Sequence, residues 1–250
     1  MRIAYDLHLH SCLSPCGDRD MTPSNLVNMA RLAGLDCIAL TDHNSCLNVP
    51  AARKAAEGTG LTVVPGMELC TAEEAHVVCL LPTEAAALEF SAAVRRTLPD
   101  VENRPEIFGE QLILDEEEGL LGQEELLLAT ASSLSVDQVL PLVRSYGGTA
   151  FPAHIDRPSY SVTASLGDIP PVGFAAAELT VRAEEDEMLR RYPLLAGMLR
   201  LVNSDAHYLH QIPDAGPWIE LADESVREMG PALAVISALD GRVPCRLGRS

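Results

Sequence analysis

Two histidines separated by one residue, His8 and His10, close an apolar stretch near the start of the chain. Because alternate residues of a β-strand point to the same side, a strand that ends here would present both imidazoles together. Three further histidines, His43, His154 and His207, also close apolar stretches, "IALTDH", "AFPAH" and "LVNSDAH". Five histidines at the ends of expected strands are typical of a metal site rather than of separate structural residues.

Acidic residues accompany these histidines at or near the expected strand ends. They are Asp6, Asp18, Asp42, Glu68 and Asp205. Imidazole and carboxylate without thiolate form the ligand mixture of Zn²⁺, Mn²⁺ or Fe²⁺ in hydrolytic sites. Ions held there would lower the pKa of a bound water toward neutrality and supply a hydroxide, so we expect a hydrolytic site.

Cysteine is the alternative ligand near the first histidine pair. Cys12 and Cys16 have a C-x3-C spacing that could belong to a zinc or iron–sulfur site, but the other five cysteines stand alone. An odd and scattered count is typical of reduced thiols in the cytosol rather than of disulfides. We therefore favour nitrogen and oxygen ligands over a cysteine-bound metal.

The elements that must position these residues alternate between short apolar strands and helical stretches. Strands are expected at 2–10, 36–43, 61–69, 75–82, 149–155, 175–180 and 199–207. Helices are expected at 22–34, 49–60, 83–98, 135–148, near 184–198 and at 225–239. This rhythm predicts an α/β fold of parallel strands with helical crossovers, in which the C-terminal strand ends assemble the active site. Residues 100–134 break the rhythm and resemble two strands around a turn, so we expect one domain, 1–250, with an insertion at about 100–134.

The net charge and the apolar runs of the sequence indicate which partners and which location to expect. The chain has 36 acidic and 18 basic residues, a formal net charge of −18, which argues against stable nucleic-acid binding. No apolar run reaches the length of a membrane helix, and no secretory leader is evident at the N-terminus. We expect a cytoplasmic protein that binds no membrane, and the sequence does not indicate its oligomeric state.

Taken in order, the motifs "DLHLHS", "ALTDHN", "PGMEL", "AHVVCL", "FPAHIDR" and "NSDAH" resemble those of the polymerase-and-histidinol-phosphatase (PHP) family of metal-dependent phosphoesterases. The resemblance extends from residue 3 to about residue 210. It implies a distorted (β/α)7 barrel of the PHP type, with up to three metal ions, Mn, Fe or Zn, at the C-terminal ends of the strands.

The resemblance also implies a ligand set for each metal. The first metal would be held by His8, His10, Glu68 and Asp205. The second, to which Glu68 bridges, would be completed by His76 and His154. The third would be held by Asp18, His43 and His207, with Asp18 preferred to Asp20 because of its distance from Pro23. Glu68 and Asp205 would thus organise catalysis.

Other polar residues near these motifs could act on the substrate or on the ligands. Arg157, three residues after His154, could bind a substrate phosphate with its planar guanidinium, or could form a surface salt bridge. His210 could donate a proton to the leaving group, or could be an exposed loop residue. Asp42 and Asp6 adjoin ligands and could orient imidazoles, or could serve only turns and caps.

A rival family, the amidohydrolase (β/α)8 barrels, also begins with a His-x-His pair. Many of its members bridge two metals with a carboxylated lysine, but Lys54 is the only lysine here and lies in an expected helix. We therefore expect a phosphoesterase acting on a small phosphorylated metabolite, such as a nucleotide or sugar phosphate. A nuclease-like phosphodiesterase acting on nucleic-acid ends is the first alternative, and a non-catalytic PHP scaffold is the second.

Overall fold

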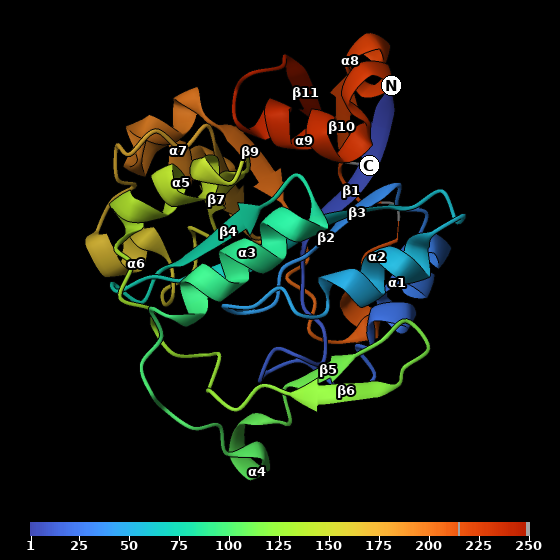
Figure 1. Cartoon of the computed structure of the whole chain (residues 1–250). Coiled ribbons are helices and arrows are strands. Elements are labelled where there is room, and N and C mark those ends of the chain that lie inside the picture. The colour runs from blue at the N-terminus through green and yellow to red at the C-terminus, as the bar shows by residue number, and fades with distance from the viewer. Residues whose placement is uncertain (215, 249–250) are drawn as a thin grey trace.

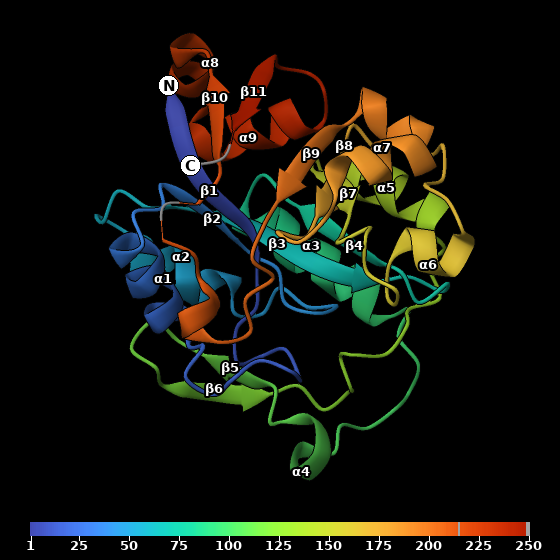
Figure 2. The ribbon, with the colours of Figure 1, turned by 180° about the vertical axis from the view of Figure 1, so that it is seen from behind.

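The computed structural model describes residues 1–214 and 216–248, and its main feature is a curled mixed sheet with helices packed on its faces (Figure 1). Seven strands form this sheet, in the spatial order β11–β10–β1–β2–β3–β4–β7. Their bounds are β1 Arg2–Leu9, β2 Cys37–Leu40, β3 Thr62–Cys70, β4 His76–Leu80, β7 Thr149–Pro152, β10 Trp218–Leu221 and β11 Cys245–Gly248. A separate parallel pair, β8 (Ala176–Leu179) and β9 (Leu199–Val202), lies beside β7 and continues the curl (Figure 2).

Helices cover both faces of the sheet. Those on one face are α1 Pro23–Leu32, α2 Val49–Ala56, α3 Glu84–Arg95 and α5 Val136–Ser145, whose buried residues share one apolar cluster. Helix α9 (Pro231–Leu239) packs against the other face, where Ile3, Tyr5 and Leu7 of β1 point. The alternation of β1 residues between the two sides follows from the two-residue period of a strand.

Local sequence signals begin the helices where they were expected. Thr22 accepts a hydrogen bond from the backbone N–H of Asn25 and precedes Pro23, the first residue of α1. Thr83 caps α3 in the same way, through Ala86 N–H. The shorter elements are α4 Pro105–Phe108, α6 Val162–Leu166, α7 Glu185–Arg191, α8 Asp223–Met229 and the 3₁₀ turns Pro193–Gly197 and Leu209–Gln211.

The expected α/β fold, a distorted barrel, is confirmed, but the strands are not all parallel. β1, β2 and β3 are parallel to one another, whereas β4 is antiparallel to both β3 and β7. Only residues 71–75 connect β3 to β4, and a parallel crossover needs a dozen residues or more. The helix expected at 225–239 is also divided, because Gly230 takes a positive φ of 78° between α8 and α9.

Residues 100–134 include a hairpin of β5 (Leu112–Leu114) and β6 (Leu120–Gln123). Both views place this hairpin and α4 at the end of the molecule opposite α8 and α9 (Figures 1 and 2). Buried Asn48 anchors it, since its amide donates to Leu112 O at 3.0 Å and its Oδ1 accepts from Leu114 N–H at 3.0 Å. The same Asn48 amide donates to Ser11 Oγ at 2.9 Å, so the hairpin is attached to the loop that follows β1.

None of the helices in the described part of the chain has the length and apolar character needed to cross a bilayer.

Candidate metal centre

Eight of the nine predicted metal ligands gather at one edge of the sheet. They are His8, His10, His43, Glu68, His76, His154, Asp205 and His207. Most follow or end strands that finish at this edge. His76 is the first residue of β4, and it joins the others because β4 runs antiparallel to β3, so its start lies beside the end of β3.

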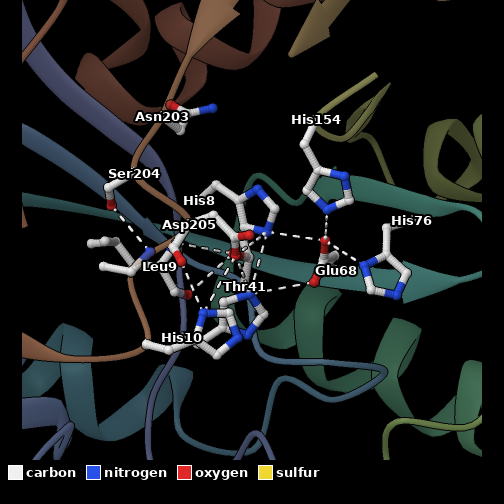
Figure 3. A network of polar contacts seen from close by, with 12 residues as sticks. His8, Leu9, His10, Thr41, Glu68, His76, His154, Asn203, Ser204 and Asp205 are labelled. Atoms are coloured by element: carbon white, nitrogen blue, oxygen red, sulfur yellow. Dashed lines mark hydrogen bonds and ion pairs between the residues drawn. The ribbon is translucent and has the colours of Figure 1, made fainter. Parts of the chain in front are cut away.

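The carboxylate of Glu68 lies at the centre of this cluster and is buried (Figure 3). Its Oε1 is 2.8 Å from His76 Nδ1, 3.1 Å from His154 Nε2 and 3.2 Å from His8 Nε2. Its Oε2 is 2.9 Å from His43 Nδ1 and 3.3 Å from His10 Nε2. Five imidazoles therefore surround one carboxylate.

Several of these buried atoms have no hydrogen-bond partner among the described residues. They include Glu68 Oε2, His43 Nδ1, His154 Nδ1 and Asp205 Oδ1. Glu68 Oε2 and His43 Nδ1 are close, but their geometry is not that of a hydrogen bond. Buried polar atoms are rarely left unpaired, and lone pairs that converge on a shared space are the arrangement that a cation requires. The donor set therefore fits bound metal ions.

Three overlapping groups of donor atoms could each hold an ion, with the atoms of a group within 4.8 Å of one another. The first group is His8, His10, Glu68 and Asp205, the set predicted for the first metal. The second is His43, Glu68 and His76, in which His43 stands where His154 was expected. The third is His10, His43 and His207, without the expected Asp18. Neighbouring groups thus share residues.

Some candidate residues lie outside these groups. The Asp18 carboxylate accepts the backbone N–H of Asp20 at 2.9 Å, and Asp20 itself is exposed. His210 is exposed, and its ring lies 5.6 Å from that of Tyr208. Asp6 accepts the backbone N–H groups of His8 and Ser204 rather than an imidazole, and burial raises its pKa to about 7.

No cysteine belongs to the three groups found among the described residues. Cys12 is buried, and burial raises the pKa of its thiol to about 12, which keeps it protonated. A protonated thiol is a poor metal ligand.

Asp42 orients His10 through a hydroxyl. Ser14 Oγ donates to Asp42 Oδ1 at 2.7 Å and accepts the backbone N–H of His43 at 3.1 Å. His10 Nδ1 lies 2.8 Å from the same oxygen. Because the single hydroxyl proton goes to Asp42, Ser14 can only accept from His10, so Nδ1 carries the proton. His10 Nε2 then directs its lone pair into the cluster, where it lies 3.3 Å from His8 Nε2.

Glu178, in the middle of β8, orients His8 and was not among the predicted residues. Its two carboxylate oxygens lie 2.9 and 3.1 Å from His8 Nδ1. It also accepts the backbone N–H of His154 at 3.0 Å and the amide of Asn203 at 2.7 Å. A carboxylate on Nδ1 fixes the ring and its tautomer, so that His8 Nε2 faces Glu68. One sequence signal was present: a lone acid inside the apolar run "AAAELT" is a buried charge that needs a partner.

The charged groups in the cluster shift one another's pKa values. Burial alone would raise the pKa of Glu68, but the surrounding histidines His76, His8 and His43 hold it well below its usual range. Burial likewise opposes a charged His8, yet Glu178, Asp205 and Glu68 raise its pKa well above the usual value. Burial and the neighbouring His10 lower the pKa of His207 to about 3, which leaves that imidazole neutral and able to bind a metal.

Backbone strain concentrates at the same place. Seven described residues other than glycine have a positive φ, and four of them belong to or adjoin the cluster. These are Asn44, His154, Tyr160 and Asp205, at φ of 50°, 28°, 54° and 52°. Such conformations persist only where the surroundings over-determine them, and they are found most often at functional sites.

A cavity of about 770 Å³ opens beside the cluster. Its lining includes His154 and Asp205 from the cluster, together with Arg157, Arg182 and Glu178. Arg157 Nη2 lies 2.8 Å from Asp205 Oδ2, so this guanidinium lines the cavity and also contacts a member of the cluster. The volume is within the range of pockets that hold small ligands or part of a larger one.

Comparison with known proteins finds a matching family model and similar enzymes. The family model described as "PHP domain" matches residues 6–158. The 5′-3′ exoribonuclease Rnm of Salmonella typhimurium is 36% identical over 78 residues, which is 30% of this chain and 26% of that enzyme. The match thus spans about a quarter of that curated relative.

Two solved structures share the fold. The lesion-specific endonuclease EndoQ from Pyrococcus furiosus has a TM-score of 0.67 and 19% identity, over 99% of this chain and 58% of that one. A Bifidobacterium adolescentis protein assigned to the metal-dependent phosphoesterases has a TM-score of 0.59 and 19% identity, over 90% and 94% of the two chains.

These relatives overturn the prediction that the partner is a small-molecule phosphate ester and that no stable nucleic-acid binding occurs. The relatives named above include an exoribonuclease and an endonuclease. That prediction relied on the net charge of −18. Exposed charges are screened beyond about 8 to 10 Å in physiological salt, so nearby groups such as Arg157 and Arg182 set the field at the strand ends.

Proposed function

The chain belongs to the PHP domain family of metal-dependent phosphoesterases, and from that premise we propose that it is a nuclease-like phosphodiesterase acting on the ends of nucleic acids. The observation that carries this proposal is the buried Glu68-centred cluster, which offers donor atoms for more than one cation and opens onto a cavity bordered by two arginines. Several cations at one site suit a substrate that brings its own negative charge.

We assign the cluster to two or three divalent transition-metal ions, Mn, Fe or Zn. Bound there, they would supply a hydroxide at neutral pH and neutralise charge on phosphoryl oxygens. Glu68 would serve two of the donor groups, and Asp205 would be the second acid of the first group. Glu178 holds His8, and Ser14 holds His10, in the tautomer whose Nε2 can bind a metal.

Arg157 is the residue that we assign to the substrate phosphate. Its side chain is 43% exposed and lies 2.8 Å from Asp205, so it can reach both the cavity and the reacting group. A guanidinium donates two parallel hydrogen bonds to phosphate oxygens, which orients the phosphodiester as well as attracting it. His210, exposed and on a separate turn, has no such position, and we leave it out of the proposed reaction.

Two observations favour the nuclease over the scaffold alternative. The cluster keeps eight of the nine expected nitrogen and oxygen donors, whereas a non-catalytic barrel needs none of them. The nucleases among the relatives support nucleic acid as the substrate class.

The test is a substrate panel with purified protein supplied with Mn²⁺ or Zn²⁺. It comprises single-stranded RNA and DNA oligonucleotides labelled at either end, duplexes, phosphomonoesters and sugar phosphates. We expect oligonucleotides to be shortened from an end, and Glu68→Gln to abolish this activity. Turnover of phosphomonoesters alone, with intact oligonucleotides, would contradict the proposal.

A further inference from the structure

Tyr160 is an exposed aromatic side chain directly beside the metal centre. Its ring centroid lies 5.0 Å from that of His76, with an angle of 30° between the planes, and the residue is 51% exposed. The chain has five tyrosines, four phenylalanines and one tryptophan. Within the described residues, Tyr160 and Tyr208 are the only two of them that are exposed.

The backbone at Tyr160 is held in an unusual conformation. Tyr160 has a φ of 54°, a genuine outlier for a bulky residue. Its carbonyl accepts the backbone N–H of His76 at 3.0 Å. The next residue, Ser161, caps α6 by accepting Ala164 N–H and donates to Arg157 O at 2.7 Å. Contacts on both sides therefore hold Tyr160 in a conformation that it would not adopt alone.

Arg157 and Tyr160 lie on the same turn after β7, and each contacts a different member of the cluster. Arg157 contacts Asp205, and Tyr160 contacts His76, whose Nδ1 is 2.8 Å from Glu68. A strand with its scissile phosphate at the cluster would carry an adjacent base past the exposed face of Tyr160.

We propose that Tyr160 is a nucleobase-stacking residue and that the substrate is single-stranded nucleic acid. This inference rests on the proposed function and narrows its substrate class. Stacking suits a substrate of any sequence, because every base has a π-face. A base inside a duplex has both faces covered by its neighbours, whereas the bases of a single strand can separate and offer a face to this ring.

The experiment compares Tyr160→Asn with Tyr160→Phe and the wild type, all loaded with Mn²⁺. Asparagine tolerates a positive φ, so this variant removes the ring and spares the backbone. The substrates are a single-stranded RNA oligonucleotide and the same oligonucleotide with abasic nucleotides at the cleaved end. Metal content is measured for each protein, and Leu166→Ala, an exposed change on α6, serves as a control.

We expect Tyr160→Asn to raise KM for the intact oligonucleotide about tenfold, the size typical of one lost base stack. Its kcat and metal content should stay at the wild-type level, its KM for the abasic oligonucleotide should not change, and Tyr160→Phe should match the wild type. Equal losses on both oligonucleotides, or a loss of metal, would overturn the proposal and make Tyr160 a support for His76.

Failure of the proposed function gives a different result. The wild type would then leave both oligonucleotides intact while hydrolysing phosphomonoesters. In that case the three proteins are compared on adenosine 5′-monophosphate and ribose 5-phosphate. If Tyr160→Asn raises KM for the nucleotide but not for ribose 5-phosphate, stacking is still supported. Equal KM values for the nucleotide in Tyr160→Asn and the wild type would refute it.

Discussion

At the residue scale, Glu68 carries the most consequence, because five imidazole nitrogens lie within 3.3 Å of its two oxygens. We expect Glu68→Gln to lower the rate of phosphodiester hydrolysis by at least about 100-fold, since even residues that only orient ligands cost 10- to 100-fold. An amide has nearly the same shape but no charge to place between two cations. Elemental analysis, the hydrolysis rate and circular dichroism would check this. Wild-type turnover by a folded Glu68→Gln protein would refute the bridging role.

Glu178 should affect metal binding by orienting His8. Glu178 Oε2 contacts both His8 Nδ1 and the Asn203 amide. In Glu178→Gln an amide N–H₂ replaces one carboxylate oxygen, so the imidazole loses its fixed orientation. We expect Mn²⁺ affinity to fall about 10- to 100-fold, measured by titrating metal into metal-free protein. Glu187→Gln, on the exposed face of α7, is the matched control and should bind metal as the wild type does. Equal affinities for the two variants would remove Glu178 from the site.

The sequence was a good guide to residues that end strands and a poor one to residues that support them. His8, His10 and Glu68 could be found because their side chains interrupt or close apolar runs. Ser14 could not, because one serine in a loop looks like any other, and its role depends on which two groups face it. Asp18 was chosen by distance along the chain, but its carboxylate turns back to its own loop.

At the element scale, the strands themselves were predictable and their directions were not. The apolar runs fix where β1 to β4 lie, yet the direction of β4 depends on the length of its connection to β3, which the motif order does not display. The reversal is what brings His76 to the active edge. A parallel β4 would begin at the opposite edge of the sheet and take that imidazole away from Glu68.

The β5–β6 hairpin offers a test at this scale. Asn48→Ala removes the partner of the buried Leu114 N–H and one donor to Leu112 O, and we expect it to destabilise the protein by about 1 to 3 kcal/mol. Urea unfolding would measure this, and limited proteolysis should cut faster within 115–119. Asn28→Ala, an exposed change on α1, should shift stability by less than about 0.5 kcal/mol. Similar stabilities for the two variants would show that Asn48 does not hold the hairpin.

At the scale of the whole molecule, metal binding should stabilise the fold. The cluster joins β1, β3, β4 and the segments after β2, β7 and β9, so ions held there link elements distant in sequence. A ligand at 100 times its dissociation constant stabilises the native state by about 2.7 kcal/mol per site. We expect chelation to lower the Tm by several degrees and Mn²⁺ to restore it, as measured by calorimetry. An unchanged Tm, with no metal detected in protein purified without chelator, would count against the metal centre.

The acidic surface predicts an unusual salt response. Proteins with 6 to 10 phosphate contacts lose about 10³- to 10⁵-fold in affinity between 50 and 200 mM salt. Here the formal net charge is −18, so added salt also screens repulsion between the protein and the strand. We expect kcat/KM for a single-stranded RNA to change by less than about tenfold over that range. A thousandfold fall would reveal a basic track along the surface.

The sharing of residues among the three donor groups has a consequence for how the site fills. His10, His43 and Glu68 each belong to two groups, so every pair of groups has one member in common. Glu68 has two oxygens and can serve two ions, but His10 has only its Nε2 free, and one imidazole nitrogen binds one ion. An ion that fills one group therefore takes a ligand away from another, and two cations so close together repel each other. Filling should be stepwise, with activity rising over a wide range of free metal. A fall in free manganese, iron or zinc in the cell would then weaken the enzyme by degrees rather than switch it off as a whole.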